Sequence, residues 1–176
     1  MKKNFLAIVI VGILLLARAQ AEELQVGFAQ VSINPDLIDQ WVDVNNDAQF
    51  DPDIDLWTDV NGNGKFDAVW MAGFQNQRPA QGIKDNLMAV AVVIDDGKNR
   101  IGIVTADTVG LMRKFVLGVR EAVPAEWGLD YLMVHATHNH EGPDTQGLWG
   151  PSFLSSGVDP NYCLLYTSDA ADDVRG

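Results

Sequence analysis

Cysteine and histidine are scarce in this chain of 176 residues, which contains one Cys and three His. A single cysteine, Cys163, excludes a disulfide within the chain. Basic residues are also few, since 12 Lys and Arg stand against 24 Asp and Glu, giving a net charge of -12. This charge argues against nucleic acid as a partner and favours a cation. The remaining composition is that of a globular protein, which excludes a disordered chain.

Long apolar runs are absent except near the N-terminus. Lys2 and Lys3 precede an apolar core at residues 5–17, and small residues follow at positions 19 and 21. The core is too short to span a bilayer comfortably. The pattern predicts a cleaved signal peptide at residues 1–21, with an uncleaved membrane anchor as the alternative. In either case the rest of the chain is exported, and we expect a secreted or periplasmic location.

The C-terminal residues 163–176 need separate treatment. Residues 163–173 resemble the in-frame translation of a transposon-type sequencing adapter, a recurrent contaminant of metagenomic assemblies. On this interpretation the natural sequence stops near Tyr162, and Cys163 carries no information about the redox state of the protein. Roughly 140 residues then remain at positions 22–162, which is one domain's worth of chain.

Residues 36–67 hold much of the negative charge, and one pattern occurs twice within them, first at residues 41–51 and again at residues 57–67. Each copy places Asp or Asn at the first, third, fifth and ninth positions of a loop, as the early half of a calcium-binding loop does. Ile54 and Trp70 stand at the twelfth position, where such loops carry Glu. We expect a loop insertion that binds Ca²⁺ structurally, or else a solvated acidic hairpin. The candidate ligands are Asp43, Asn45, Asp47, Asp51, Asp59, Asn61, Asn63 and Asp67.

Residues 87–136 have the pattern of an α/β core. Apolar runs at 87–94 and 100–106 flank a turn, which predicts a hairpin. Residues 109–123 have apolar side chains at helical spacing, with Asp107 or Thr108 as the cap, and another strand follows at 129–136. The sequence therefore predicts an α/β fold with a mixed sheet, a βαβ unit whose strands are parallel, and the acidic loop insertion.

Two histidines follow the last predicted strand. His138 and His140 come just before Gly142 and Pro143, which end regular structure. In an extended chain alternate side chains share a face, so these two rings would point the same way and His135 would point the other way. Two converging imidazoles at a strand end are typical of a zinc site, although hydrogen-bonded structural histidines are the alternative.

Asp107 ends the preceding predicted strand. In open α/β sheets, ligands gather outside the carboxyl ends of the parallel strands, so Asp107 is expected to share a crevice with His138 and His140. It would then be a catalytic carboxylate that orients or supports the metal site, or else a plain helix cap. Arg78 lies in a loop-like region at 69–85, where it would be exposed or would meet a polar group of a substrate.

Three segments together resemble the neutral/alkaline, non-lysosomal ceramidase family. Residues 136–143 read Ala-Thr-His-Asn-His-Glu-Gly-Pro and are similar to the family's Thr-His-Thr-His-Ser-Gly-Pro signature. Residues 26–35 and 103–111 are similar to its opening strand and to its following strand and turn. The agreement runs from about residue 25 to about residue 150, with the acidic repeat as an insertion. Asn139 and Glu141 replace the family's Thr and Ser, which weakens the transfer of its substrate.

The resemblance implies zinc-dependent cleavage of the N-acyl amide of ceramide or a related lipid, giving a fatty acid and a sphingoid base. His138 corresponds to the first metal-binding His of the signature, and His140 would bind zinc, contact substrate or orient the water. The family's other ligands, a second His, a Glu and a Tyr, lie further along its chain, as does its serine-bearing segment. The chain would thus be an incomplete catalytic domain that binds zinc weakly and hydrolyses nothing alone. Its partners would be a lipid amide and a membrane surface.

Two other classes of protein fit parts of the sequence. His-x-His also opens metallo-β-lactamase and amidohydrolase sites, but Gly142 and Pro143 stand where the former has Asp-His. The latter needs its motif on an early barrel strand, whereas a hairpin and a helix come first here. The second class is a calcium-dependent binding or adhesion module, in which the Asp/Asn repeats are functional and the histidines structural. Metal analysis of the protein separates these classes.

Overall fold

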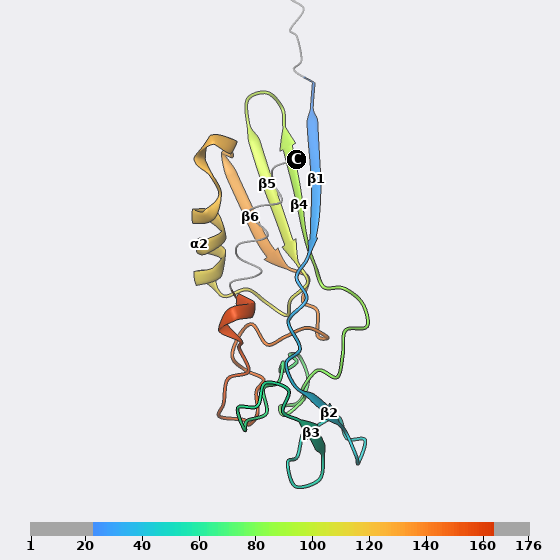
Figure 1. The fold of residues 1–176 in the computed structure, drawn as a ribbon. Helices are drawn as coiled ribbons and strands as arrows, with labels where there is room; N and C mark the ends of the chain where they lie inside the picture. Colours follow the sequence, from blue (N-terminus) through green and yellow to red (C-terminus); the bar gives the residue numbers. More distant parts are fainter. Residues whose placement is uncertain (1–22, 164–176) are drawn as a thin grey trace, which may run out of the picture.

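The computed structural model describes residues 23–163, whose arrangement is shown in Figure 1. The predicted signal peptide at residues 1–21, and all of the predicted tail except its first residue, lie outside this range. No helix within residues 23–163 has the length and apolar character needed to cross a bilayer. A four-stranded sheet forms one end of the molecule, and a two-stranded sheet with two long loops forms the other (Figure 1).

The larger sheet has the strand order β1-β4-β5-β6. β1 pairs with β4, and β4 with β5, in antiparallel fashion, whereas β5 and β6 are parallel. The predicted hairpin and the predicted parallel pair are both confirmed, and the chain has a mixed α/β fold. The strands are β1 (Gln25–Ser32), β4 (Met88–Asp95), β5 (Arg100–Ala106) and β6 (Tyr131–Ala136).

The crossover from β5 to β6 contains helix α2 (Arg113–Ala122) and the 3₁₀ turn η1 (Ala125–Trp127). The helix is shorter than predicted, and its N-cap residue is Met112, which makes no side-chain capping bond. Capping by Asp107 or Thr108 was therefore a wrong prediction. The physical reason is that residues 107–111 form an irregular turn, whose carbonyl groups bond to the loop after β6 instead of starting a helix.

Alternate residues of the sheet form the core with α2. Ala89, Ala91, Val104 and Ala106 are 2–6% exposed, and Val119 of α2, which is also buried, packs with them. Small alanine side chains on two adjacent strands let other segments approach the sheet closely. Ile33, Leu132, Tyr162 and Cys163 complete this cluster of buried residues.

The opposite face of the sheet is apolar and exposed. Val26, Phe28, Ile101, Tyr131 and Met133 are 40–64% exposed. Register partners lie on the same face, and the pairing aligns Phe28 with Val92, Ile103 and Met133 across the four strands. The chain therefore presents a broad apolar surface on this face of the sheet. The sequence pattern did not predict it, because a strand buried on one face and a strand buried on both faces can be rich in the same apolar residue types.

The second sheet joins the two copies of the acidic repeat. β2 (Gln40–Val42) and β3 (Leu56–Thr58) are antiparallel, and Trp41 and Trp57, the equivalent residues of the two copies, are register partners. Phe50 and Phe66, also equivalent, stack with ring centroids 4.0 Å apart. The sequence repeat is thus a structural repeat, in which matching residues pack against each other.

Candidate metal centre

The rings of His138 and His140 meet immediately after β6. Their Nε2 atoms are 3.1 Å apart, and the ring centroids are 4.7 Å apart. The predicted convergence is confirmed, but its predicted cause was wrong. β6 ends at Ala136, and His138 has a φ of 66°, so strand alternation does not orient the rings. A left-handed residue in an irregular loop brings them together, and such a φ is unusual for a residue with a side chain.

A backbone carbonyl fixes the tautomer of His138. Its Nδ1 lies 2.7 Å from the carbonyl oxygen of Val109. Because a carbonyl only accepts, Nδ1 carries the proton, and the lone pair of the neutral ring is on Nε2. This is the arrangement that orients a metal-binding histidine, whose other ring nitrogen donates to a carbonyl or carboxylate. The free lone pair of His138 therefore points at His140.

The spacing of the two nitrogens suits a single zinc ion. Two nitrogens bonded to one tetrahedral zinc at ~2.0–2.1 Å would lie about 3.3 Å apart. The observed 3.1 Å is close to this value. No group of three His, Cys, Asp or Glu side chains able to hold a metal occurs among residues 23–163. The described part of the chain thus offers two converging ring nitrogens, one donor fewer than the three protein ligands of a catalytic zinc site.

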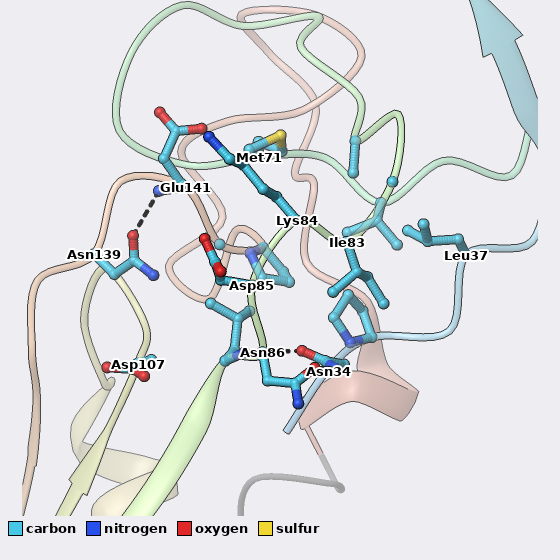
Figure 2. A pocket seen from close by; sticks show the side chains of 17 residues that line it. Asn34, Leu37, Met71, Ile83, Lys84, Asp85, Asn86, Asp107, Asn139 and Glu141 are labelled. Carbon is cyan, nitrogen blue, oxygen red and sulfur yellow. Dashed lines mark hydrogen bonds between the residues drawn. The ribbon is translucent and has the colours of Figure 1, made fainter. Parts of the chain in front are cut away.

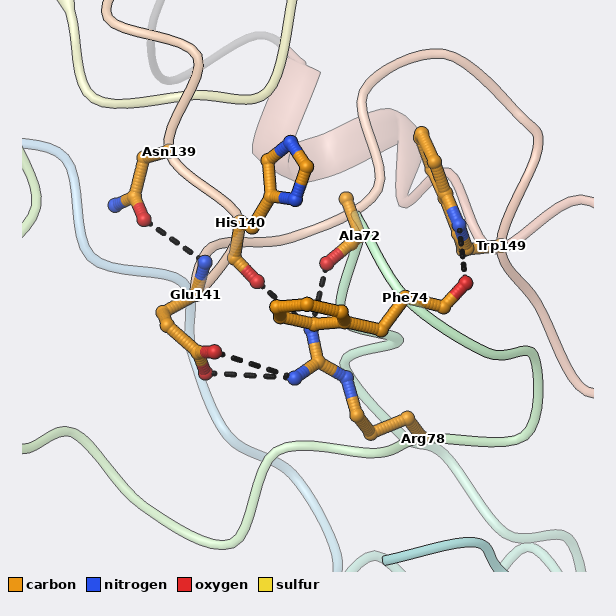
Figure 3. A network of polar contacts seen from close by, with 7 residues as sticks. All are labelled: Ala72, Phe74, Arg78, Asn139, His140, Glu141 and Trp149. Carbon is orange, nitrogen blue, oxygen red and sulfur yellow. Dashed lines mark hydrogen bonds and ion pairs between the residues drawn. The ribbon is translucent and has the colours of Figure 1, made fainter.

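Arg78 supports this loop from another part of the chain. Its Nη2 donates to the carbonyl oxygens of Ala72 at 2.6 Å and of His140 at 2.7 Å, as Figure 3 shows. Its Nη1 pairs with Glu141 at 3.4 Å, and its side chain is only 12% exposed. The expectation of an exposed loop arginine was therefore wrong, because the backbone carbonyls of two segments provide it with buried partners.

Asp107 and His135 take other partners. Asp107 accepts hydrogen bonds from the backbone N–H of Met88 at 3.0 Å and from Thr137 Oγ1 at 3.1 Å. Asp107 therefore joins the end of β5 to the start of β4 and, through Thr137, to the loop after β6 that carries His138 and His140, which we call the histidine loop. His135 bonds to Thr105 Oγ1 at 2.8 Å on the exposed face of the sheet, in agreement with its interpretation as a residue outside the metal pair.

A cavity of about 560 Å³ lies beside the loop that carries the histidines, and Figure 2 shows the side chains that line it. Asn139 and Glu141, which alternate with the two histidines, line it together with Asp107. His138 and His140 are not among its lining residues. The crevice predicted for Asp107 and both histidines is thus divided by the loop. The remaining lining residues are Asn34, Pro35, Leu37, Val69, Met71, Ala80, Gly82, Ile83, Lys84, Asp85, Asn86, Leu87, Gly142 and Pro143.

Comparison with solved structures places this arrangement among known folds. The crystal structure of neutral ceramidase from Pseudomonas aeruginosa superposes with a TM-score of 0.56 at 16% sequence identity, over 86% of this chain. The chain has the fold of part of a neutral ceramidase. It spans 21% of that chain's length. A second structure, a ceramidase complexed with C2, matches 69% of this chain and 15% of its own, with a TM-score of 0.46 and 22% identity. No family model and no curated protein matches the sequence.

The ceramidase-like fold holds the region after the histidines by one buried carboxylate. Asp144 is 1% exposed, and its oxygens accept four backbone N–H groups at 2.8–3.2 Å, from Gln146, Gly147, Trp149 and Gly157. One side chain thereby folds residues 144–157 into a compact loop. Sequence reasoning missed this role, although an Asp directly after Gly142-Pro143 is a signal for a turn stabilised by its own side chain.

The Asp/Asn loops adjoin β2 and β3, at the end of the molecule opposite the larger sheet (Figure 1). All eight candidate calcium ligands make a local hydrogen bond. Asp59, for example, accepts the backbone N–H groups of Gly62, Asn63 and Gly64 at 2.7–3.1 Å. Asp67 Oδ2 accepts the side-chain amides of Asn61 and Asn63. The other bonds involve Asp43, Asn45, Asp47 and Asp51.

Proposed function

We propose that this chain is part of a zinc-dependent hydrolase that cleaves the amide of N-acyl sphingosine (ceramide) or a related lipid. The observation that carries the proposal is the approach of His138 Nε2 and His140 Nε2 to 3.1 Å, with the ring of His138 oriented by a carbonyl. The ceramidase-like fold supports the substrate class. Without a metal, His140 Nε2 donates its hydrogen to the lone pair of His138 Nε2, and a zinc ion would take the place of that hydrogen.

His138 and His140 would hold the zinc ion through Nε2. When bound at such a site, zinc lowers the pKa of a coordinated water toward ~7 and polarises a carbonyl oxygen. The protein's own contribution is orientation. Val109 keeps the proton of His138 on Nδ1, and Arg78 holds the backbone of His140. Asp107 accepts a hydrogen bond from Thr137, which lies on the same loop, and we propose that Asp107 helps to position the two histidines through this bond.

We also propose that this chain alone binds zinc weakly and does not turn over substrate. A catalytic zinc site has three protein ligands and one open position, and the described residues supply two. The missing ligands would come from a longer chain. The purified chain, assayed with a fluorescent N-acyl sphingosine and excess zinc, is expected to release no fatty acid. If the wild-type chain releases fatty acid and His138→Ala does not, the proposed inactivity of the chain would be contradicted and the proposed metal site would be supported.

A lipid surface is the second proposed partner. The exposed apolar face of the large sheet, which includes Val26, Phe28 and Met133, supports this assignment. Because the protein has a net charge of -12, an anionic lipid surface would repel it, and the proposed partner is therefore an electrically neutral lipid surface. An exported protein that acts on lipids would meet such a surface, and the signal-like residues 1–21 support export.

For the acidic repeat we propose a structural role with bound Ca²⁺. Asp, Asn and backbone oxygens are the ligands that this ion prefers. The two copies of the repeat pack against each other, which supports the proposal that they form one structural unit and that bound Ca²⁺ would hold the insertion in place. Hydrogen bonds now made within the loops, such as those accepted by Asp59, would be shared with the ion. A calcium-dependent binding module remains the second candidate function, favoured by this paired arrangement.

Metal analysis distinguishes the proposals. At equilibrium in a dialysis buffer that contains zinc and calcium, the wild-type chain is expected to bind zinc, and His138→Ala is expected to bind much less of it. His135→Ala is the matched control, because His135 lies within β6, before the loop, and bonds Thr105 and a backbone carbonyl. Zinc retained in His138→Ala would contradict the hydrolase. Calcium as the sole bound metal, with ligand binding abolished by chelation, would favour the binding module.

A further inference from the structure

His140 rests against a segment that lies more than sixty positions earlier in the sequence, at residues 72–78. Gly73 has a φ of 101°, and a Cβ at this position would overlap the ring of His140. The backbone N–H of Ala72 donates to the carbonyl of Gly142 at 2.9 Å. The ring of His140 also meets the ring of Phe74 edge to face, with centroids 5.5 Å apart. The imidazole therefore has a close-fitting support on the side away from His138.

Arg78 fastens this support to the histidine loop. Nη2 bridges the carbonyls of Ala72 and His140, one from each segment, and the guanidinium carbon lies 4.8 Å from the centroid of the Phe74 ring. Phe74 is thus between Arg78 and His140, as Figure 3 shows. One planar cation fixes both the backbone of His140 and the ring against which its imidazole packs.

We infer that Arg78 is the positioning residue for His140, and that it sets the metal affinity of the histidine pair without touching the metal. The expected change in metal affinity rests on the proposed function, whereas the contacts between Arg78 and the histidine loop do not depend on it. Lysine in place of Arg78 would keep the charge. It would lose the planar fork that reaches two carbonyls at once and stacks on an aromatic ring.

The experiment measures zinc affinity of the full chain by competition with a chelating dye, for wild type, Arg78→Lys, His140→Ala and the double variant. Residues that orient a metal ligand typically contribute 10–100-fold to affinity, so Arg78→Lys is expected to weaken zinc binding about tenfold or more. In the His140→Ala background the same change is expected to have almost no effect, because the ligand that Arg78 positions is gone. An equal loss in both backgrounds would overturn the inference.

Arg100→Lys is the control for the loss of an arginine fork. Arg100 also bonds a carbonyl, that of Trp127, and pairs with Asp95 at 2.7 Å, but it lies at the opposite end of β5. The zinc affinity of Arg100→Lys is expected to equal that of the wild type. A decrease as large as that of Arg78→Lys would overturn the inference, because it would show a general effect on folding.

A metal-free measurement separates this inference from the proposed function. In zinc-free protein, the imidazole resonances of His140 are expected to shift in Arg78→Lys, whereas those of His135 stay in place. If the wild-type chain binds no zinc and this shift occurs, the metal site is wrong, and only the positioning of His140 by Arg78 stands. If the His140 resonances do not move, the inference about Arg78 is wrong, whatever the zinc affinity.

Discussion

Asp39 and Asp55 each bind the loop of the other repeat. Asp39, which precedes the first copy, accepts the backbone N–H groups of Val60 and Asp67 in the second copy at 2.9 and 2.8 Å. Asp55, the equivalent residue before the second copy, accepts those of Val44 and Asp51 in the first copy at 2.9 and 2.8 Å. Both carboxylates are buried, with 6% and 5% exposure. The insertion is thus a two-fold unit closed by exchanged side chains.

Loss of either carboxylate is expected to destabilise this unit. Asp39→Ala and Asp55→Ala each leave two backbone donors without their acceptor, which costs about 1–3 kcal/mol. Denaturant unfolding followed by tryptophan fluorescence would measure the change. Asp36→Ala is the matched control, since this carboxylate is exposed, and it should change stability by less than about 0.5 kcal/mol. A similar effect of all three variants would contradict the exchange.

Calcium is expected to stabilise the repeats. At about 100 times its dissociation constant, an ion that binds only the folded state adds ~2.7 kcal/mol to the free energy of unfolding. The melting temperature should therefore fall on addition of a chelator. In Asp59→Ala, which removes the first candidate ligand of the second loop, the difference between calcium and chelator should shrink. Melting temperatures that are the same with calcium and with chelator would exclude the proposed role.

Tyr162 is expected to make the stability fall at alkaline pH. Burial, with further contributions from the charges of Cys163 and Asp107, raises the pKa of Tyr162 above its ordinary value of 10.0. The folded state therefore keeps the phenol proton at a pH where the unfolded chain releases it. This stabilisation is complete below pH ~10 and is lost as the pH rises above it. Tyr162→Phe should flatten the loss of stability between pH 9 and 11 (about one unit either side of the ordinary value), and Tyr131→Phe should not.

Phe28 offers a test of the apolar face. It is 64% exposed, so Phe28→Ser should change stability by less than about 1 kcal/mol. If this face contacts lipid, the variant should bind zwitterionic vesicles more weakly than the wild type in a sedimentation assay. Phe153→Ser, at an 87% exposed position outside the sheet, is the control. Equal vesicle binding by the three proteins would contradict the assignment.

The large sheet was predictable because its signals are local. Alternating and continuous apolar runs fixed β4, β5 and β6 to within two residues, and the helical spacing before β6 implied a parallel pair. The start of α2 was not predictable, because tertiary hydrogen bonds from Asn139 and His138 hold the preceding turn open. Tertiary contacts override local capping preferences in this way.

Only the two histidines of the candidate site were predictable. The spacing of His138 and His140 identified the pair, although a left-handed backbone and not strand alternation joins them. Gly73, Phe74 and Arg78 are more than sixty positions away, and no spacing rule connects them to His140. Neither the cavity beside Asn139 nor the role of Asp144 had a pattern of its own, because both depend on where distant loops meet.

X-ray absorption at the zinc edge would show directly whether His138 and His140 bind the metal. In the zinc-loaded chain we expect two imidazole nitrogens at ~2.0–2.1 Å from the zinc ion, with water or buffer oxygens as the other ligands. His138→Ala should leave at most one imidazole, and His135→Ala should leave both. A spectrum without imidazole scattering, or one that His138→Ala leaves unchanged, would show that these rings do not bind the metal and would contradict the account.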